Sequence, residues 1–290
     1  MNDISTAQDP NQQRLHYTLL SGFLKGTVKT PQMPENALRI RTLLRDPYTS
    51  TEHLSRVINS DPPLAAYLMQ FADSPLLKSA RPCRSLRDVI ARLGMNQLNN
   101  LVLAFAVRNL FISKELALQK VFRARWNASL VRAAWAASLT SLVTGINADD
   151  ALLGGLFQDI GSLPLLAELE NWPDFSRETD DLHAVCEDLS GQVGTILLTV
   201  WKQPSQLIDC ARHRNSQPHP ETSANPNKVQ LFELVQVAEA IQNPAKHQLL
   251  ADLPLAQALF VETDVEHIKQ QLKAQVNLWF LMLGSKTRVT

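Results

Sequence analysis

The segment Gly155–Leu166, which reads GLFQDIGSLPLL, contains the residue that most resembles part of a chemical site. Asp159 is a carboxylate in an apolar stretch, and such a side chain can bind a metal ion or act as a general base. Gly161 follows two residues later. The preceding residue is Gln158, whose neutral amide is a poor ligand for transition metals. The segment is therefore open to three interpretations: an active site, the remnant of one, or an ordinary helix end.

No second group of residues completes a catalytic centre around Asp159. A metal site needs converging His, Cys or carboxylate ligands, but no two of the seven histidines share a metal-binding helical spacing. His213 is the best single candidate, and we interpret it as a solvated surface residue. The motifs of serine nucleophiles, phosphate loops and dinucleotide sites are missing from the sequence. The sequence predicts no catalytic residue, no bound metal and no cofactor.

Three further patterns have structural explanations that we favour over functional ones. The neighbouring Gly154 and Gly155 indicate close packing of two helices rather than a ligand site. The basic stretch with Arg123, Arg125 and Arg132 is interpreted as a solvated helix face rather than a nucleic-acid contact. Two pairs of adjacent acids are expected in the first turns of helices, where carboxylates complement the helix dipole: Asp149 with Asp150, and Asp180 with Asp181.

The overall composition narrows the class of protein. The 28 basic residues balance the 28 acidic ones, so the net charge gives no reason to expect nucleic acid or an anionic membrane as a partner. The polar N-terminus lacks the regions of a signal peptide, and the apolar stretch at 98–111 is too short and too polar to cross a bilayer. We expect a cytoplasmic protein whose three cysteines are reduced.

The elements that must position these residues are helices. Apolar residues recur at i, i+3, i+4 and i+7 in several stretches, and no stretch alternates as a half-buried strand does. Leu64, Tyr67, Leu68 and Phe71 form one such helix face. Helix boundaries are expected at several capping and stop signals: Thr49 with Glu52, Asp61 followed by Pro62, Ser85 with Asp88, Gly94, Pro204 and Asp264.

The helices predict an all-α fold of two helical subdomains. Residues 1–12 are expected to be a disordered tail, 13–115 the first subdomain, and 116–285 the second, with a long helix from Lys114 to Thr144 joining them. The segment 215–227 contains three prolines and no periodicity, which indicates a mobile loop.

Several segments together resemble the HDOD domain, a bacterial output module related to the HD metal-dependent phosphohydrolases. The resemblance rests on SRVINSDPPLAAYLMQFADSPL, SLRDVIARLGMNQLNNLVLAFAVRNLF and LLGGLFQDIGSLPLL, which occur in the family's order. It implies that the second subdomain is a degenerate HD-like bundle. The family's structural motif positions correspond to Asp61, Pro62, Asp73, Ser74, Gly94, Gly161 and Trp201, and Asp73 stands where the family has asparagine.

The same resemblance implies where the metal ligands of the HD superfamily would fall. Ala128 occupies the position of the early histidine, and Gln158–Asp159 replaces the His–Asp dyad. Further ligand positions fall at Ser190, near His213 with Arg214–Asn215 in place of paired histidines, and at Glu239. Alanine has no ligand atom, so too few ligands remain for an activated water. We expect Asp159 to have a structural role, in which it accepts hydrogen bonds from an N–H, a hydroxyl or an arginine.

The resemblance implies a non-catalytic regulatory module that binds a protein partner or a small-molecule signal. Its partners would be signalling proteins such as cyclic-dinucleotide enzymes, kinases or response regulators. The alternative is a divergent metal-dependent phosphohydrolase or nucleotide-binding protein, which would use a rearranged site around Asp159 with ligands from His183, His213 or Glu239. The oligomeric state does not follow from the sequence.

Overall fold

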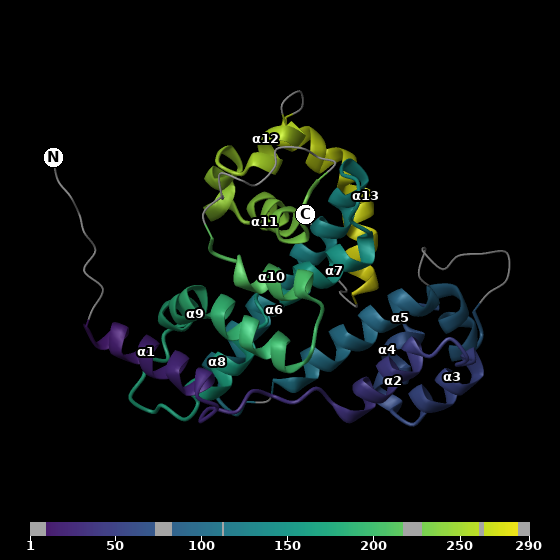
Figure 1. Cartoon of the computed structure of the whole chain (residues 1–290), viewed down its shortest axis with the longest axis horizontal. Helices are drawn as coiled ribbons and strands as arrows, with labels where there is room; N and C mark the ends of the chain where they lie inside the picture. Colours follow the sequence, from purple (N-terminus) through teal and green to yellow (C-terminus); the bar gives the residue numbers. More distant parts are fainter. Residues whose placement is uncertain (1–9, 73–82, 112, 217–227, 261–263, 284–290) are drawn as a thin grey trace.

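The computed structural model describes residues 10–72, 83–111, 113–216, 228–260 and 264–283. These ranges contain thirteen α-helices and no strand. The expected all-α fold is therefore confirmed for the described residues. Figure 1 shows the helices in two groups, with α2–α5 on one side of the molecule and α6–α13 on the other. Asp73, Ser74 and most of the segment 215–227 lie outside the described residues.

The first group contains four helices that bury their apolar stripes against one another. They are α2 (Glu35–Arg45), α3 (Thr51–Asn59), α4 (Pro62–Met69) and α5 (Leu86–Leu110). The Asp61 side chain accepts the backbone N–H of Leu64 and so caps α4, and Ser85 with Asp88 forms the expected capping box of α5. Gly94 interrupts α5 with φ at 75°, a left-handed conformation that favours glycine, and a second helical part follows the kink.

The predicted cap of α3 was wrong by one residue. Ser50, not Thr49, is the N-cap, and its hydroxyl accepts the backbone N–H of His53. The Thr49 hydroxyl is buried and has no hydrogen-bond partner. Both residues are good N-cap types, and the local sequence does not distinguish which of them has its hydroxyl within reach of the free N–H groups.

The second group is built around α6. Its members are α6 (Leu116–Leu139), α7 (Ala148–Phe157), α8 (Ser162–Leu169), α9 (Thr179–Val200), α10 (Ser205–Arg212), α11 (Leu231–Gln242), α12 (Pro254–Phe260) and α13 (Val265–Met282). Short 3-10 helices lie at Thr140–Leu142 and Pro244–Ala251. Pro204 precedes α10, and the Asp264 side chain caps α13, as predicted. Helices α7, α11 and α13 all pack on α6, which makes α6 the centre of this group.

The helix α1 (Pro10–Leu24) packs with the second group rather than the first. It begins inside the segment expected to be a disordered tail, and it contacts α9. Its Leu19 and Phe23 are buried in a separate hydrophobic cluster with Leu118, Val121 and residues of α8 and α9. The range 13–115 therefore contains a helix that contributes to the core of the other subdomain. Sequence periodicity shows which face of a helix is buried but not against which partner.

Two close helix approaches hold the second group together. A Cβ atom at Gly155 would lie 2.5 Å from the Ala133 Cα, so this glycine permits α7 to pack directly on α6, as the sequence predicted. A Cβ atom at Gly161 would lie 2.0 Å from the Ser190 carbonyl oxygen, so the start of α8 must cross α9 at a residue without a side chain. Both contacts bring the segment after α7 to the centre of the fold.

The described residues include one stretch, Ala148–Leu169, with the length and apolar composition of a membrane-crossing helix, and 89% of its most apolar window is buried inside the fold. This is the burial expected of core helices, since the stretch comprises α7 and α8. The cysteines Cys83, Cys186 and Cys210 are all free thiols.

Candidate functional site

Asp159 lies at the end of α7 and is the centre of a buried hydrogen-bond network. Its Oδ1 and Oδ2 atoms accept two hydrogen bonds from Arg125, each 2.8 Å long. The Nε atom of Arg214 lies 3.1 Å from Oδ1. The hydroxyls of Ser162 and Ser190 also donate to Oδ1, at 2.9 and 2.7 Å. Asp159 therefore has the structural partners that its position in an apolar stretch predicted: arginines and hydroxyls.

The interpretation of the basic stretch as a solvated helix face was wrong for Arg125 and Arg132. Their exposed fractions are only 6% and 2%, whereas Arg123 is exposed on the same helix. Arg132 donates to the carbonyl oxygen of Gly155 at 2.8 Å and to Glu239 at 2.7 Å. Buried arginines need carboxylate partners, and their partners come from segments distant in sequence.

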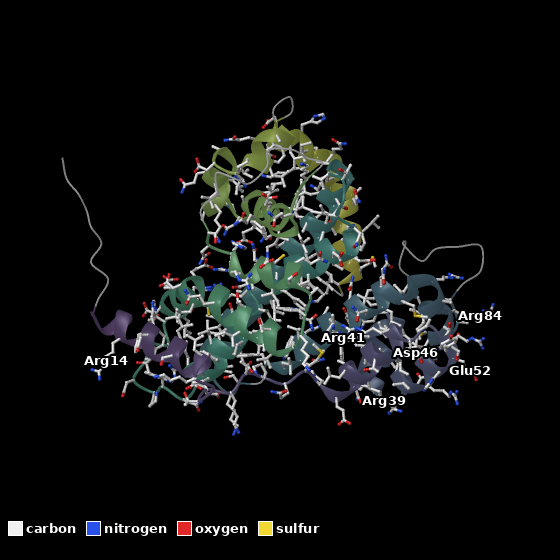
Figure 2. All side chains as sticks on the ribbon, viewed as in Figure 1. Arg14, Arg39, Arg41, Asp46, Glu52 and Arg84 are labelled. Carbon is white, nitrogen blue, oxygen red and sulfur yellow. The ribbon has the colours of Figure 1, made fainter. Side chains whose placement is uncertain are left out.

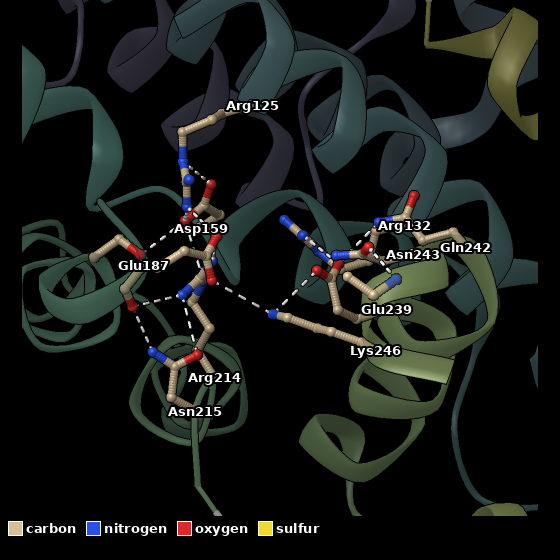
Figure 3. Close-up of polar contacts among 12 residues, drawn as sticks. Arg125, Arg132, Asp159, Glu187, Arg214, Asn215, Glu239, Gln242, Asn243 and Lys246 are labelled. Atoms are coloured by element: carbon tan, nitrogen blue, oxygen red, sulfur yellow. Dashed lines mark hydrogen bonds and ion pairs between the residues drawn. The ribbon is translucent and has the colours of Figure 1, made fainter. Parts of the chain in front are cut away.

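A second ion pair lies beside the first, and one lysine links them. Figure 3 shows Arg132 paired with Glu239 on one side and Asp159 surrounded by arginines on the other. Glu187 of α9 contacts Arg125 at 3.1 Å and Arg214 at 2.8 Å. Lys246 lies 3.3 Å from Glu239 and 3.6 Å from Glu187. We call these residues the buried charge network: Arg125, Arg132, Asp159, Glu187, Arg214, Glu239 and Lys246.

The electrostatics of the network keep its carboxylates ionised. Burial raises the pKa of the Asp159 carboxyl, but the charges of Arg214 and Arg125 outweigh it, and the pKa lies well below its ordinary value. The pKa of Glu239 is lowered in the same way: burial opposes ionisation, whereas Arg132 and Lys246 favour it more strongly. The network contains four cationic side chains and three carboxylates, so it carries an excess of positive charge.

The residues at this position do not fit the metal ion of the HD superfamily. The Asp159 carboxylate is already neutralised by arginine, which contacts both of its oxygens, and Oδ1 also accepts from two serines, so a metal cation would have to displace these partners or be repelled by the guanidinium charge. A guanidinium keeps its proton at any physiological pH and so cannot become a ligand. The parts of the chain that the structure describes contain no cluster of three or more His, Cys, Asp or Glu residues placed to hold a metal.

The structure brings some of the sequence-predicted positions together and separates others. Ser190 and Glu239 lie in or beside the network, and Gln158 is buried next to it, with its Oε1 atom lacking a hydrogen-bond partner. Ala128 is exposed on α6, where it offers no ligand atom. His213 is half-buried and stacks on the Phe232 ring at 4.4 Å instead of contacting Asp159.

Sequence reasoning missed Arg125, Arg214 and Glu187 as parts of this site. Arg214 had a signal, because the resemblance to the family aligned Arg214–Asn215 with the paired histidines. The sequence also carried a signal for Arg125. Arg125, Ser129 and Arg132 are spaced so that they share one face of α6, which indicates that the three polar side chains have a common environment. Net charge was a poor guide here, because it says nothing about where individual charges lie.

The motif positions Asp61, Gly94, Gly161 and Trp201 act on the fold around the site rather than in it. The Trp201 indole N–H donates to the carbonyl oxygen of Pro31 at 3.0 Å, which ties the end of α9 to the segment leading into α2. Pro62 occupies the first position of α4, where its missing N–H is harmless.

An all-helical fold with a buried carboxylate held by arginines follows the segment order that the sequence shares with the HDOD domain. The chain belongs to the HDOD family, whose family model matches residues 30–217. No curated protein matches it significantly.

Solved structures with the same fold come from several bacteria. A protein of Shewanella amazonensis SB2B, provisionally named a metal-dependent phosphohydrolase, has a TM-score of 0.80 at 20% identity and covers 95% of this chain and 100% of its own. A provisionally named signal transduction protein of Marinobacter aquaeolei VT8 has a TM-score of 0.59 at 21% identity, covering 97% of this chain and 67% of its own. An HDOD domain protein of unknown function from Geobacter sulfurreducens has a TM-score of 0.58 at 16% identity. That match covers 94% of this chain and 98% of its own. At these identities the likeness shows the fold alone.

Proposed function

We propose that this chain is a non-catalytic regulatory module of bacterial signal transduction, which acts in the cytoplasm by binding a protein partner or a small-molecule signal. One observation carries the proposal: Arg125 and Arg214 pair with the carboxylate of Asp159, the residue that the resemblance to the family aligns with the His–Asp dyad. Membership of the HDOD family, and a structural neighbour named a signal transduction protein, fit a regulatory role.

The chemistry of the network supports the absence of hydrolysis. Metal-assisted hydrolysis needs an open coordination position at which a water molecule loses a proton. Arginine side chains around Asp159 neutralise the carboxylate without creating an acidic water. Glu239, the other carboxylate at a ligand position, is paired with Arg132 and Lys246 in the same manner.

A metal-loading assay on the full chain tests the non-catalytic part of the proposal. The purified protein would be incubated with Mn²⁺, Fe²⁺, Zn²⁺ or Mg²⁺, passed through a desalting column and measured by elemental analysis, and hydrolysis of bis(p-nitrophenyl) phosphate would be followed in parallel. We expect no stoichiometric metal and no hydrolysis. Stoichiometric metal that is lost in Asp159→Ala but kept in Asp174→Ala, an exposed control, would favour the divergent phosphohydrolase instead.

A co-purification experiment in a native host tests the regulatory part. The tagged chain would be isolated from the bacterium and its partners identified by mass spectrometry. We expect enrichment of a cyclic-dinucleotide enzyme, a histidine kinase or a response regulator, confirmed by reconstitution of the complex from purified proteins. If no such complex can be reconstituted, partner binding as the mode of action would be rejected.

A further inference from the structure

A cavity of about 240 Å³ lies between the two groups of helices, away from the buried charge network. Helix α2 contributes Arg41 and Arg45 to its wall, and the start of α7 contributes Asp149 and Asp150. The remaining polar wall is rich in amides: Asn96, Asn99, Asn100, Asn147 and Gln203. Leucine, methionine and proline side chains form the rest of the wall, and apolar walls with several converging polar groups are typical of a small-molecule site.

Arg41 is a wall residue with much of its hydrogen-bonding capacity unused. Its Nε–H group is buried and has no acceptor among the described residues. Its two other nitrogens reach only the Gln203 Oε1 atom at 3.3 Å and the Met33 sulfur at 3.5 Å, both neutral and distant acceptors. A guanidinium offers five N–H donors in a planar fork, so most of this fork is without a partner.

Arg45 adds a second positive charge to the same wall. Arg45 follows Arg41 by one turn of α2, so both side chains lie on the same face of the helix. Burial and, after it, the charge of Arg45 lower the pKa of Arg41. In the described part of the chain neither arginine forms an ion pair with a carboxylate. A guanidinium group binds a carboxylate or a phosphate through paired hydrogen bonds, and this wall carries two such groups.

The α7 side of the cavity carries acidic side chains instead of basic ones. Burial and the neighbouring Asp150 raise the pKa of Asp149. Within the described part of the chain, Asp149 forms no ion pair with a cationic side chain. The Asp149 side chain accepts one hydrogen bond, from the Asn100 amide at 3.3 Å. Its remaining lone pairs, together with the amide oxygens of the wall, are acceptors suited to N–H groups of a ligand.

We propose that this cavity binds a small molecule that carries an oxoanion at one end and N–H donors at the other. Arg41 and Arg45 hold the oxoanion, and Asp149 with the neighbouring amides accepts the N–H groups. A nucleoside monophosphate supplies this chemistry with a phosphate, and an amino acid supplies it with a carboxylate. The proposal deepens the regulatory function above, on which it rests, because it gives the module a chemical class of signal.

The position of the cavity gives such a ligand a physical effect. Its walls come from α2 and α5 in the first group and from α7 and the residues before α10 in the second. The direct polar links across this boundary include the weak Arg41–Gln203 bond and the bonds from the Asn100 amide to Asp149 at 3.2 and 3.3 Å. A ligand held by both walls therefore stabilises one relative arrangement of the two groups, which is how a binding event becomes a change of shape.

Calorimetric titration of the full chain tests the proposal, with guanosine monophosphate and glutamate as the phosphate and carboxylate probes. We expect one of the two probes to bind with one molecule per chain. Arg41→Gln and Arg45→Gln should each weaken that binding at least about tenfold, the effect of losing a charge-assisted hydrogen bond. The control is Arg39→Gln on the same helix. Figure 2 shows Arg39 at the outer edge of the molecule, so binding should not change.

Two comparisons make the outcome decisive. Guanosine and inorganic phosphate each lack one end of the proposed ligand, so both should bind more weakly than the nucleotide if the nucleotide is the probe that binds. Circular dichroism and the unfolding midpoint establish that the Arg41→Gln protein is folded. The proposal is overturned if neither probe saturates the protein at about 10 mM, or if folded Arg41→Gln binds as tightly as the unaltered chain. The metal-loading result is independent of this titration, so the two proposals fail separately.

Discussion

Arg125 donates hydrogen bonds to both carboxylate oxygens of Asp159, with its Nε atom 2.8 Å from Oδ2 and its Nη2 atom 2.8 Å from Oδ1. The two residues are 34 positions apart, on α6 and just after α7, and both are buried. This bidentate pair therefore fixes the end of α7 against α6.

Removal of Arg125 should strongly destabilise the fold. Arg125→Met replaces the guanidinium with an apolar side chain and leaves Asp159, among the described residues, with Arg214 and two serines as donors. We expect the free energy of unfolding to fall by about 3–5 kcal/mol, as when one partner of a buried ion pair is deleted. Urea denaturation measures the change. Arg123→Met on the exposed side of α6 is the control and should alter stability by no more than about 0.5 kcal/mol. A loss below about 1 kcal/mol in Arg125→Met would contradict the role of the pair.

Acid should destabilise the protein through Asp159. The pKa of this carboxyl is lowered in the folded state from an ordinary value of 3.8, so the unfolded chain binds protons more readily than the native one. Stability is therefore fully present above the unfolded pKa and declines as the pH falls below about 4 toward the native pKa. Urea unfolding at a series of pH values measures the slope.

Asp159→Asn should remove part of that slope, because the variant has no carboxyl to protonate at this position. Glu187 and Glu239, whose pKa values are also lowered, retain their share. Asp174→Asn, an exposed substitution, should leave the slope unchanged. Identical acid slopes in Asp159→Asn and the unaltered chain would mean that other carboxylates govern acid unfolding.

Restoring histidine at the dyad should not restore hydrolysis. Gln158→His supplies a ligand atom, and so does the double variant with Ala128→His, but the oxygens of Asp159 remain bound to Arg125 and Arg214. We expect no Mn²⁺-dependent hydrolysis of bis(p-nitrophenyl) phosphate above the rate of the unaltered chain. Robust metal-dependent hydrolysis by the Gln158→His variant would show that a metal ion can displace the arginines from the Asp159 carboxylate.

Gly161→Ala should disrupt the crossing of α8 over α9. The added methyl group would lie 2.0 Å from the Ser190 carbonyl oxygen and 2.5 Å from the Gly194 nitrogen, both of them backbone atoms. Because backbone cannot move as a flexible side chain does, we expect a loss of about 3 kcal/mol or more. Thermal and urea unfolding measure it, with the exposed Ala167→Ser as the control on α8. An unfolding midpoint equal to that of the control would show that α8 and α9 can separate without cost.

The fold was more predictable from sequence than the site. Helix faces and most caps follow from local patterns, which is why Asp61, Ser85 and Asp264 were placed correctly. The partners of Asp159 come from α6, α8, α9 and the end of α10, and no local pattern encodes such a meeting. The packing of α1 on α9 could not be predicted either, because the apolar stripe of α1 could pack against the apolar stripe of any other helix.

The family model ends at residue 217, yet Glu239 of α11 and Lys246 of the following 3-10 helix belong to the buried charge network. A protein truncated at that boundary would keep Arg132 in the core and lose the carboxylate that neutralises it. Helices α11 and α13, which cover α6, would be lost as well. The chain after 217 therefore packs into the same core as the matched region, and we expect the part of the chain that folds on its own to extend past that boundary.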